Sequence, residues 1–518
     1  MSLAVVISRA LDGLSAPEVQ VEVHLANGLP SFTLVGLADT EVKEARERVR
    51  AALAQSGFAF PHNRRITVNL APADLPKESG RFDLPIALGI LAAQGLLDPQ
   101  HLAQHEFAGE LSLAGELRPV RGALALALAA RRAGSLRTLV LPRASAAEAA
   151  RVEGVDVRSA GHLAEVVRSL LPATSADRSD AVLREALPRA QAPSGPPAAA
   201  QPDLAEVRGQ AAAKRALEVA AAGQHSLLLV GPPGSGKSML AQRLAGLLPP
   251  MSDDEALASA ALHSVSSAGF DASRFGQRVV RAPHHSASAV ALVGGGSPPR
   301  PGEISLAHAG VLFLDELPEF PRLALEALRE PLESGQVTIS RAARQAQYPA
   351  RFLLVAAMNP CPCGWLGAPA SLGRACRCNP DAVLRYQARL SGPLLDRIDM
   401  QVEVPAVPPA ELLGTAQALA EPSAVVARRV LDARARQLDR QGCSNGEIPP
   451  GEVEARCALD RPALQFLQSA AVKLGWSGRS LHRVMRLSRT LADLAGQDEV
   501  GVVQVAEAIQ YRRALPQP

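Results

Sequence analysis

GPPGSGKS, residues 231–238, is a glycine-rich loop between the apolar run 227–230 and a segment that favours a helix. Strand, loop and helix in this order are typical of a phosphate-binding loop. Glycines let backbone N–H groups approach phosphate oxygens, and the start of the following helix adds positive potential at the same point. The sequence therefore predicts a nucleoside-triphosphate site in an α/β domain with a parallel sheet.

The loop contains a candidate for each contact that a triphosphate requires. Lys237 is expected to reach the β- and γ-phosphates, and Ser238 to offer its hydroxyl to Mg²⁺. Lys237 is one of only five lysines in an arginine-rich chain, which fits the need for a compact ammonium at this point. The residues predicted to line the nucleotide here are Gly231, Pro232, Pro233, Gly234, Ser235, Gly236, Lys237, Ser238 and Met239.

Two acidic residues follow a second apolar run, at 311–314. Carboxylates at the carboxyl end of a buried parallel strand lie at the edge of the sheet where ligands bind. Asp315 is therefore predicted to hold Mg²⁺, and Glu316 to act as the general base for an attacking water.

Length and composition limit the possible classes of protein. A chain of 518 residues is long enough for two or three domains. Its net charge of +3 is close to neutral, so any binding of nucleic acid must depend on local arginine clusters. No apolar run approaches the roughly 20 residues of a membrane span. Residues 1–14 have no basic start and contain Arg9 and Asp12, unlike a signal peptide, so we expect a cytoplasmic protein.

Residues 1–172 are expected to form a separate α+β domain, because residues 19–25 and 66–70 alternate in polarity and 42–53 have helical spacing. Residues 75–88 and 109–134 resemble the proteolytic domain of Lon, with its S5-type fold. The resemblance places the nucleophile at Arg81 and the catalytic lysine at Leu124, so it implies the fold without Ser–Lys activity. Ser79 is the alternative nucleophile. A role in assembly or substrate gating is expected instead.

Residues 173–202 are rich in Ala, Pro and Ser and predict a linker, with a possible short helix at 181–187. A motor domain is expected over 203–405 and a helical lid domain over 406–518.

Val207 precedes an alanine-rich helix, where AAA+ ATPases hold the adenine; a capping turn is the alternative. Asn359 ends the apolar run 352–357 and resembles the sensor-1 residue that orients water; a cap before Pro360 is the alternative.

Two arginines resemble further parts of an AAA+ site. SGPLLDRID, residues 391–399, resembles the segment of the arginine finger, which falls on Arg397. A finger acts on a neighbouring subunit and implies a ring; an ion pair with Asp396 or Asp399 is the alternative. GRSLHRVMRLSRTLADL, residues 478–494, resembles the lid helix and places the sensor-2 arginine at Arg479. Two further arginines of this helix, Arg483 and Arg486, are expected on a solvated face.

Two insertions distinguish this motor from other ATPases. Residues 281–310 are rich in Gly and Pro, and two β-like runs in 334–352 flank a tip that carries Arg341 and Arg344. They resemble the helix-2 insert and the pre-sensor-1 hairpin of the branch that contains minichromosome maintenance helicases and the Mg-chelatase motor. By this resemblance Arg341 and Arg344 would contact DNA phosphates; a solvated basic tip is the alternative. His284 and His285 are interpreted as structural or pore-loop residues, because adjacent histidines are poorly spaced for one metal.

Four of the six cysteines fall in one short segment, unlike a disulfide framework. Cys361 and Cys363 form one C-x-C pair, and Cys376 and Cys378 form another. Two such pairs can converge on a tetrahedral ion, and thiolates select Zn²⁺. A metal-free reduced loop is the alternative, because the usual structural spacing is C-x₂-C.

Taken together, these features resemble the YifB/ComM family of Mg-chelatase-like AAA+ ATPases over nearly the whole chain. The resemblance implies a homohexamer, not attached to a membrane, that uses ATP and Mg²⁺ to move on single-stranded, forked or branched DNA. It implies branch migration in homologous recombination and natural transformation. A Mg-chelatase-type motor and a Lon-like ATP-dependent protease or remodelling factor are the alternatives. The N-terminal domain and the cysteine loop disfavour the first, and Arg81 and Leu124 disfavour the protease.

Overall fold

The computed structural model describes residues 3–36, 44–75, 77, 80–171, 186–193, 201–296, 299–341, 344–367, 375–408 and 421–512. Two compact units divide the chain: residues 1–197 with 257–275, and residues 198–256 with 276–518. Within the described ranges, no helix combines the length and the apolar character that crossing a membrane requires.

The second unit is built on a parallel five-stranded sheet with the order β11-β14-β17-β10-β18. The strands are β10 (Leu227–Val230), β11 (Val280–Arg281), β14 (Val311–Leu314), β17 (Leu353–Met358) and β18 (Met400–Glu403). Every residue of β10, β14 and β17 is buried, as expected for apolar runs that are covered on both faces of a parallel sheet. The predicted α/β class and the three apolar strands are confirmed.

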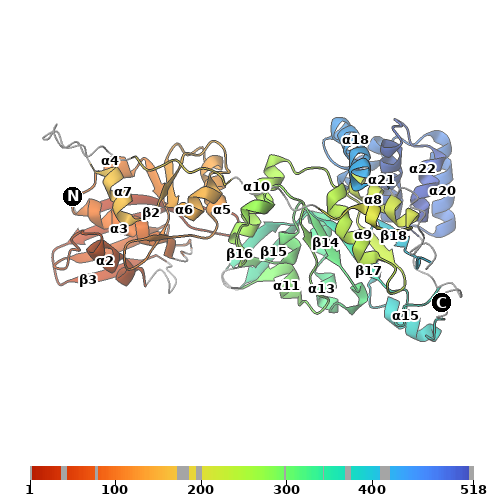
Figure 1. Ribbon diagram of the computed structural model, residues 1–518, viewed down its shortest axis with the longest axis horizontal. Helices are drawn as coiled ribbons and strands as arrows, with labels where there is room; N and C mark the ends of the chain where they lie inside the picture. Colours follow the sequence, from red (N-terminus) through yellow and green to blue (C-terminus); the bar gives the residue numbers. More distant parts are fainter. Residues whose placement is uncertain are drawn as a thin grey trace. The chain divides into compact units, whose positions relative to one another are not determined.

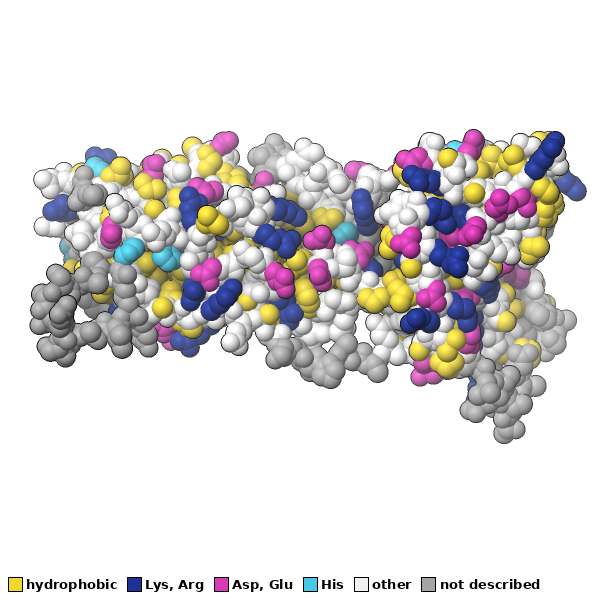
Figure 2. Space-filling model, turned by 90° about the horizontal axis from the view of Figure 1, so that it is seen from above, with side chains coloured by type: hydrophobic (Ala, Val, Ile, Leu, Met, Phe, Trp, Pro, Cys, Tyr) yellow, Lys and Arg dark blue, Asp and Glu magenta, His cyan; other side chains and the backbone are white. Residues whose placement is uncertain are grey.

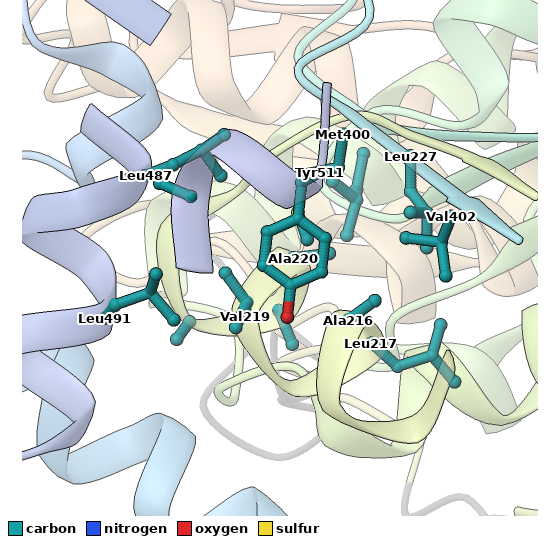
Figure 3. Close-up of a cluster of buried hydrophobic side chains, with 14 of the residues drawn as sticks. Ala216, Leu217, Val219, Ala220, Leu227, Met400, Val402, Leu487, Leu491 and Tyr511 are labelled. Carbon is teal, nitrogen blue, oxygen red and sulfur yellow. The ribbon is translucent and has the colours of Figure 1, made fainter. Parts of the chain in front are cut away.

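Helices α8 (Ala211–Gly223) and α9 (Lys237–Arg243) precede and follow β10 in the chain. Figure 1 shows the C-terminal helices grouped next to α8. These are α18 (Ser423–Gln441), α19 (Val453–Cys457), α20 (Arg461–Leu474), α21 (Gly478–Leu494) and α22 (Val502–Gln510). In Figure 3 the ring of Tyr511 lies among apolar side chains of α8, β10, β18 and α21. The helical lid and the sheet therefore share one hydrophobic core.

One prediction about the lid is wrong. Arg483 and Arg486 were expected on a solvated face of α21. Arg483 is instead only 15% exposed and lies 3.3 Å from a carboxylate oxygen of Asp399. Arg486 donates a hydrogen bond of 2.5 Å to the carbonyl of Ile448. Both arginines face neighbouring parts of the unit, because α21 is packed between other elements and has little free surface.

Both insertions of the second unit have regular structure. The first contains α11 (Ala289–Val293), the short ladder β12 (Gly294–Gly295) with β13 (Arg300–Pro301), and α12 (Glu303–Leu306). The second is an antiparallel hairpin of β15 (Gln336–Arg341) and β16 (Arg344–Pro349), in which Arg341 pairs with Arg344. The predicted hairpin is confirmed. The remaining helices are α13 (Arg322–Glu326), α14 (Arg329–Ser334), α15 (Pro380–Gln387) and α16 (Gly392–Leu395).

The first unit contains a mixed seven-stranded sheet with the order β3-β4-β2-β1-β5-β8-β9. Its strands are β1 (Leu3–Arg9), β2 (Glu18–Ala26), β3 (Ser31–Val35), β4 (Arg65–Ala71), β5 (His105–Phe107), β8 (Thr138–Pro142) and β9 (Val157–Ala160), with a separate ladder of β6 (Glu110–Leu111) and β7 (Leu117–Arg118). Its helices are α2 (Ala45–Gln55), α3 (Asp83–Ala93), α4 (Pro99–Leu102), α5 (Ala123–Arg132), α6 (Arg143–Ala149) and α7 (Leu163–Leu170). The alternating strands predicted at 19–25 and 66–70 are confirmed as β2 and β4.

The predicted linker is partly described. Pro188 and Ala190 form backbone hydrogen bonds with Ser159 and Val157 of β9. Most of the short helix suggested at 181–187 lies outside the described residues.

Residues 257–275, which the sequence placed inside the motor domain, belong to the first unit. They include most of α10 (Asp253–Val265). Leu257, Ala260 and Ala261 recur at helical spacing and are buried in the same apolar cluster as Leu124 of α5. Arg151 lies over the ring of Phe275, with 4.4 Å between its guanidinium carbon and the ring centroid. A segment of the ATPase sequence therefore completes the core of the first unit.

Ala261→Arg should destabilise the first unit selectively. Ala261 is only 2% exposed, so an arginine there would be overpacked and its charge unpaired, at a cost of about 2 kcal/mol or more. Hydrogen exchange of the amides in β1 and α5 should speed up in the variant. The fluorescence of Trp365 and Trp476, both in the second unit, should keep its unfolding midpoint. Ser267→Arg, on the exposed part of the same segment, is the matched control. Equal effects of the two variants would contradict the assignment.

Candidate nucleotide-binding site

The loop 231–238 has the backbone geometry that phosphate binding needs. It leaves the carboxyl end of β10, and α9 begins at Lys237. Gly234 and Gly236 have φ of +75° and +93°, which other residues rarely adopt. A Cβ on Gly231 would lie 2.1 Å from the carbonyl oxygen of Val404, just after β18. Three glycines of the motif are therefore required by conformation or by close packing, and the cradle fits a phosphate chain.

Lys237 is held at the centre of this cradle. Its ammonium donates hydrogen bonds to the carbonyls of Gly231 at 2.8 Å and Pro232 at 2.9 Å, and to the amide oxygen of Asn359 at 3.3 Å. Burial lowers the pKa of Lys237, and the charges of Asp315 and Glu316 oppose this effect. The structure thus brings together the predicted phosphate lysine, at the start of α9, and the predicted sensor-1 residue, directly after β17.

Ser238 and Asp315, the two residues predicted to hold Mg²⁺, are in direct contact. The hydroxyl of Ser238 donates to Asp315 Oδ2 at 2.7 Å. The other carboxylate oxygen of Asp315 accepts from the backbone N–H of Glu316 at 2.9 Å. A hydroxyl and a carboxylate placed at one point are a fitting oxygen donor set for Mg²⁺.

Glu316 follows Asp315 directly in the chain and lies beside this pair. Its φ of +52° is unusual for a residue with a side chain, and its side chain is 54% exposed. Nδ1 of His285 lies 3.1 Å from Glu316 Oε2. The sequence indicated a structural or pore-loop role for His285 and did not predict this contact.

Gln210 is a second residue that sequence reasoning missed. Its side-chain amide donates to the carbonyls of Ser235 at 3.1 Å and Pro405 at 2.5 Å, so it ties the loop to the segment after β18. Val207, the predicted adenine contact, is 4% exposed and packs in the core of the unit. The side chain of Val207 therefore stabilises the core. Gln210, three residues later, is the polar side chain of this segment that contacts the phosphate-binding loop.

The four clustered cysteines converge as the paired motifs predict. The sulfur of Cys361 lies 3.4 Å from that of Cys363 and 3.7 Å from that of Cys376, and all four sulfurs fall within 4.8 Å of one another. Tetrahedral zinc with Zn–S distances of about 2.3 Å separates its sulfurs by about 3.8 Å. The donor set and its spacing therefore fit a zinc ion.

The cysteine loop lies against the phosphate-binding loop. Gly364 follows the first cysteine pair and has a φ of +81°. A Cβ on Gly364 would lie 2.5 Å from Cδ of Pro233 in the phosphate-binding loop. Asn359 and Cys361 are only two positions apart. The cysteine cluster is thus positioned to brace both the loop and the predicted sensor.

Arg397 and Arg479 are near one acidic residue. Arg397 is 8% exposed and lies 2.5 Å from Glu333 Oε1, while Arg479 is 70% exposed and lies 3.9 Å from the same oxygen. Arg397 also donates to the carbonyl of Pro393 at 2.7 Å. Its acidic partner is therefore Glu333 of α14, and neither Asp396 nor Asp399.

The remaining predicted residues lie in the hairpin and in the first unit. Arg341 and Arg344 face each other across the end of the hairpin, and their side chains are outside the described atoms. In the first unit, Arg81 is 3% exposed and donates to the carbonyl of Arg121 at 3.4 Å, and Leu124 is fully buried. Ser79 lies outside the described residues.

Comparison with known proteins gives matches across both units. Profiles described as "Magnesium chelatase, subunit ChlI", "Subunit ChlI of Mg-chelatase" and "Magnesium chelatase, subunit ChlI C-terminal" match residues 203–412, 21–145 and 420–512. "Competence protein ComM" of Haemophilus influenzae is 50% identical over 512 residues, which cover 99% of this chain and 98% of that protein. "Uncharacterized protein YifB" is 48% identical in Salmonella typhimurium and 46% in Escherichia coli, each over 99% of this chain and 97% of the relative.

Gly364→Ala should weaken the binding of ATP. The added methyl group would push on Pro233 and shift the phosphate-binding loop, with a loss of affinity of roughly three- to tenfold from overpacking. Titration with a fluorescent ATP analogue measures the dissociation constant of each variant. Gly367→Ala is the matched control, because Gly367 has a similar φ of +76° but nothing within 4 Å of its Cβ position. Equal affinities in the two variants would show that the cysteine loop does not brace the phosphate loop.

Proposed function

The chain belongs to the YifB/ComM family of Mg-chelatase-like AAA+ proteins, and from this premise we propose that it is an ATP-driven DNA motor. More specifically, we propose a homohexameric, cytoplasmic branch-migration helicase that acts in homologous recombination and natural transformation. Membership of this family indicates ATPase activity with ATP and Mg²⁺. The direct contact between Ser238 and Asp315, beside Lys237 and Glu316, is the observation that best supports hydrolysis at this site.

Each residue of the site has a separate role in the proposed hydrolysis. Bound Mg²⁺ supplies positive charge to the phosphates. The N–H groups of residues 231–238 and Lys237 bind and orient the phosphate oxygens, and Ser238 with Asp315 would hold the metal. Glu316 accepts the proton of the attacking water, and Asn359 orients that water from the neighbouring strand.

The proposed ring rests on the resemblance of Arg397 to an arginine finger. Arg397 and Arg479 both approach Glu333, so two cations predicted to act on the γ-phosphate are oriented by one carboxylate. We propose that Arg397 reaches the nucleotide of an adjacent subunit as an arginine finger, exchanging Glu333 for phosphate oxygens. A seam between subunits would then be part of every active site.

The two insertions support a grip on DNA. The hydroxyl of Tyr348 in β16 donates to the carbonyl of Pro299 in the first insertion at 2.8 Å. Both insertions therefore form one connected element. Acidic and basic side chains are intermixed over the face shown in Figure 2, so affinity for DNA would depend on local groups such as Arg341 and Arg344. The name of the relative from Haemophilus influenzae, "Competence protein ComM", supports a role with incoming DNA.

A Mg-chelatase-type motor is the second candidate, because the matching profiles carry the name of that enzyme's subunit. The cysteine cluster against the phosphate loop has no evident use in such a motor, and the full-length relatives include a competence protein. A Lon-like protease is disfavoured, because buried Arg81 and Leu124 occupy the positions of its two catalytic residues. We propose an inactive Lon-like domain at 1–172, to which residues 257–275 also belong, a linker at 173–202, an ATPase core over the rest of 203–405 and a lid at 406–518.

DNA should stimulate the ATPase. Forked or four-way-junction DNA is expected to raise the rate, and the apparent affinity for DNA should fall steeply between about 50 and 200 mM salt, because binding releases counterions. The double variant Arg341→Ala/Arg344→Ala should keep the DNA-independent rate and reduce the slope of log affinity against log salt by about two per subunit that is engaged. Arg461→Ala, in the exposed start of α20, is the control. A rate that ignores every DNA structure at low salt would contradict the motor proposal.

The cysteine cluster should hold close to one equivalent of Zn²⁺. Elemental analysis of the purified protein measures the metal, and Cys376→Ser should lower the content because one thiolate of the tetrahedral set is lost. Cys443→Ser, outside the cluster, should retain it. Less than about half an equivalent in the unaltered protein would count against a stoichiometric site.

A further inference from the structure

The segment that carries Arg397 is fixed at the amino end of the parallel sheet. Ser226 directly precedes β10, and its backbone N–H donates to Asp399 Oδ2 at 2.9 Å. In return, the backbone N–H of Asp399 donates to the hydroxyl of Ser226 at 2.9 Å. Five positions separate Ser226 from Gly231, which is about 16 Å along a strand. The segment of the predicted finger is therefore anchored at the opposite edge of the sheet from the phosphate-binding loop of its own subunit.

Two arginines from the lid hold the same segment. Arg483 of α21 forms an ion pair with Asp399, with 3.3 Å between Nη1 and Oδ1, and the two side chains are 15% and 19% exposed. Arg512, which follows α22, donates to the carbonyl of Ile398 at 2.6 Å. Burial raises the pKa of Asp399, but the charge of Arg483 and the hydrogen bonds from Ser226 hold that pKa below its usual value. Asp399 is therefore ionised, and it joins the start of β10 to the lid.

Helix α21 approaches the finger segment at two points. Arg479 and Arg483 are four positions apart, so they lie on one face of the helix. Arg479 and Arg397 both lie near Glu333, and Arg483 pairs with Asp399, two residues after Arg397. One helix thus borders both the side chain of the predicted finger and the backbone segment that carries it.

We propose that Arg483 is a positioning residue for the arginine finger. By holding Asp399, it fixes the segment from which Arg397 reaches the nucleotide of the adjacent subunit. A misplacement of about 1 Å can cost about a hundredfold in rate, so a residue that does not touch the nucleotide can still set the turnover. Loss of Arg483 would impair the site of the neighbour and leave that of its own subunit intact. This inference rests on the proposed function, because it requires Arg397 to act between subunits.

Arg483→Gln tests this role in the full-length protein. The variant loses the charge opposite Asp399, so its ATPase rate should fall about ten- to a hundredfold. Its dissociation constant for a fluorescent ATP analogue should stay unchanged. Arg483→Lys keeps a cation and should retain most of the rate. Asp399→Asn keeps an acceptor for the N–H of Ser226 and should reproduce the loss. Arg428→Gln removes an ion pair with Asp432 at the lid surface, where Arg428 is 75% exposed, and is the matched control.

Rings of mixed subunits distinguish an effect on the neighbour from an effect within one subunit. Subunits with Glu316→Gln lack the proposed general base but keep the finger. In a random equal mixture with Arg483→Gln subunits, about one site in four combines an intact base with an intact finger from the next subunit. Mixing should therefore restore hydrolysis, and to the same extent as mixing Arg397→Ala with Glu316→Gln.

The outcomes separate this inference from the proposed ring. Recovery with Arg397→Ala but not with Arg483→Gln would overturn the positioning role, because Arg483 would then act on the site of its own subunit. An unchanged ATPase rate in Arg483→Gln, or a loss of ATP binding, would overturn it as well. Absence of recovery with Arg397→Ala would overturn the finger itself, and with it any residue that positions the finger.

Discussion

The hydrogen bond from Ser238 to Asp315 is the contact on which the candidate site depends. It joins the loop after β10 to the end of β14, across the intervening strand β17, which contributes Asn359. Three apolar strands buried in one parallel sheet bring their carboxyl ends to the same edge. Lys237, Asp315 and Asn359 meet there, although they are far apart in the chain. The geometry of the site is thus a consequence of strand order, and the hydrophobic core fixes that order.

The same sheet is rigidly connected to the helical lid. Tyr511 packs among apolar side chains of α8, β18 and α21, and its backbone carbonyl accepts a hydrogen bond from the backbone N–H of Gln401 at 2.7 Å. Deeper in the unit, His225 contacts Thr490 at 2.7 Å, and Thr490 accepts from Asn445 at 3.0 Å. Burial lowers the pKa of His225 to about 4, so this link stays neutral near pH 7. The lid and the sheet therefore share buried polar contacts as well as one hydrophobic core.

Sequence alone predicted the parts of the structure that local patterns determine. Four features could be recognised from residue types at short spacing in the sequence. They are the phosphate loop, the acid pair, the hairpin and the cysteine pairs. Contacts between distant segments were not predictable in this way. Arg483 looked solvated because Asp399 is remote in sequence, and residues 257–275 looked like part of the motor because their partners lie in α5. The contact between His285 and Glu316 joins the segments after β11 and β14, which no local sequence pattern brings together.

The proposed ATPase depends most directly on Glu316, which would act as the general base at this edge of the sheet. The most direct measurement combines equilibrium binding of ATP with single-turnover hydrolysis in Glu316→Gln. The amide keeps the size of the side chain but cannot take a proton from water. We expect an ATP affinity close to that of the unaltered protein and a hydrolysis rate at least about a hundredfold lower, the usual contribution of a general base. Hydrolysis at the unaltered rate would contradict it.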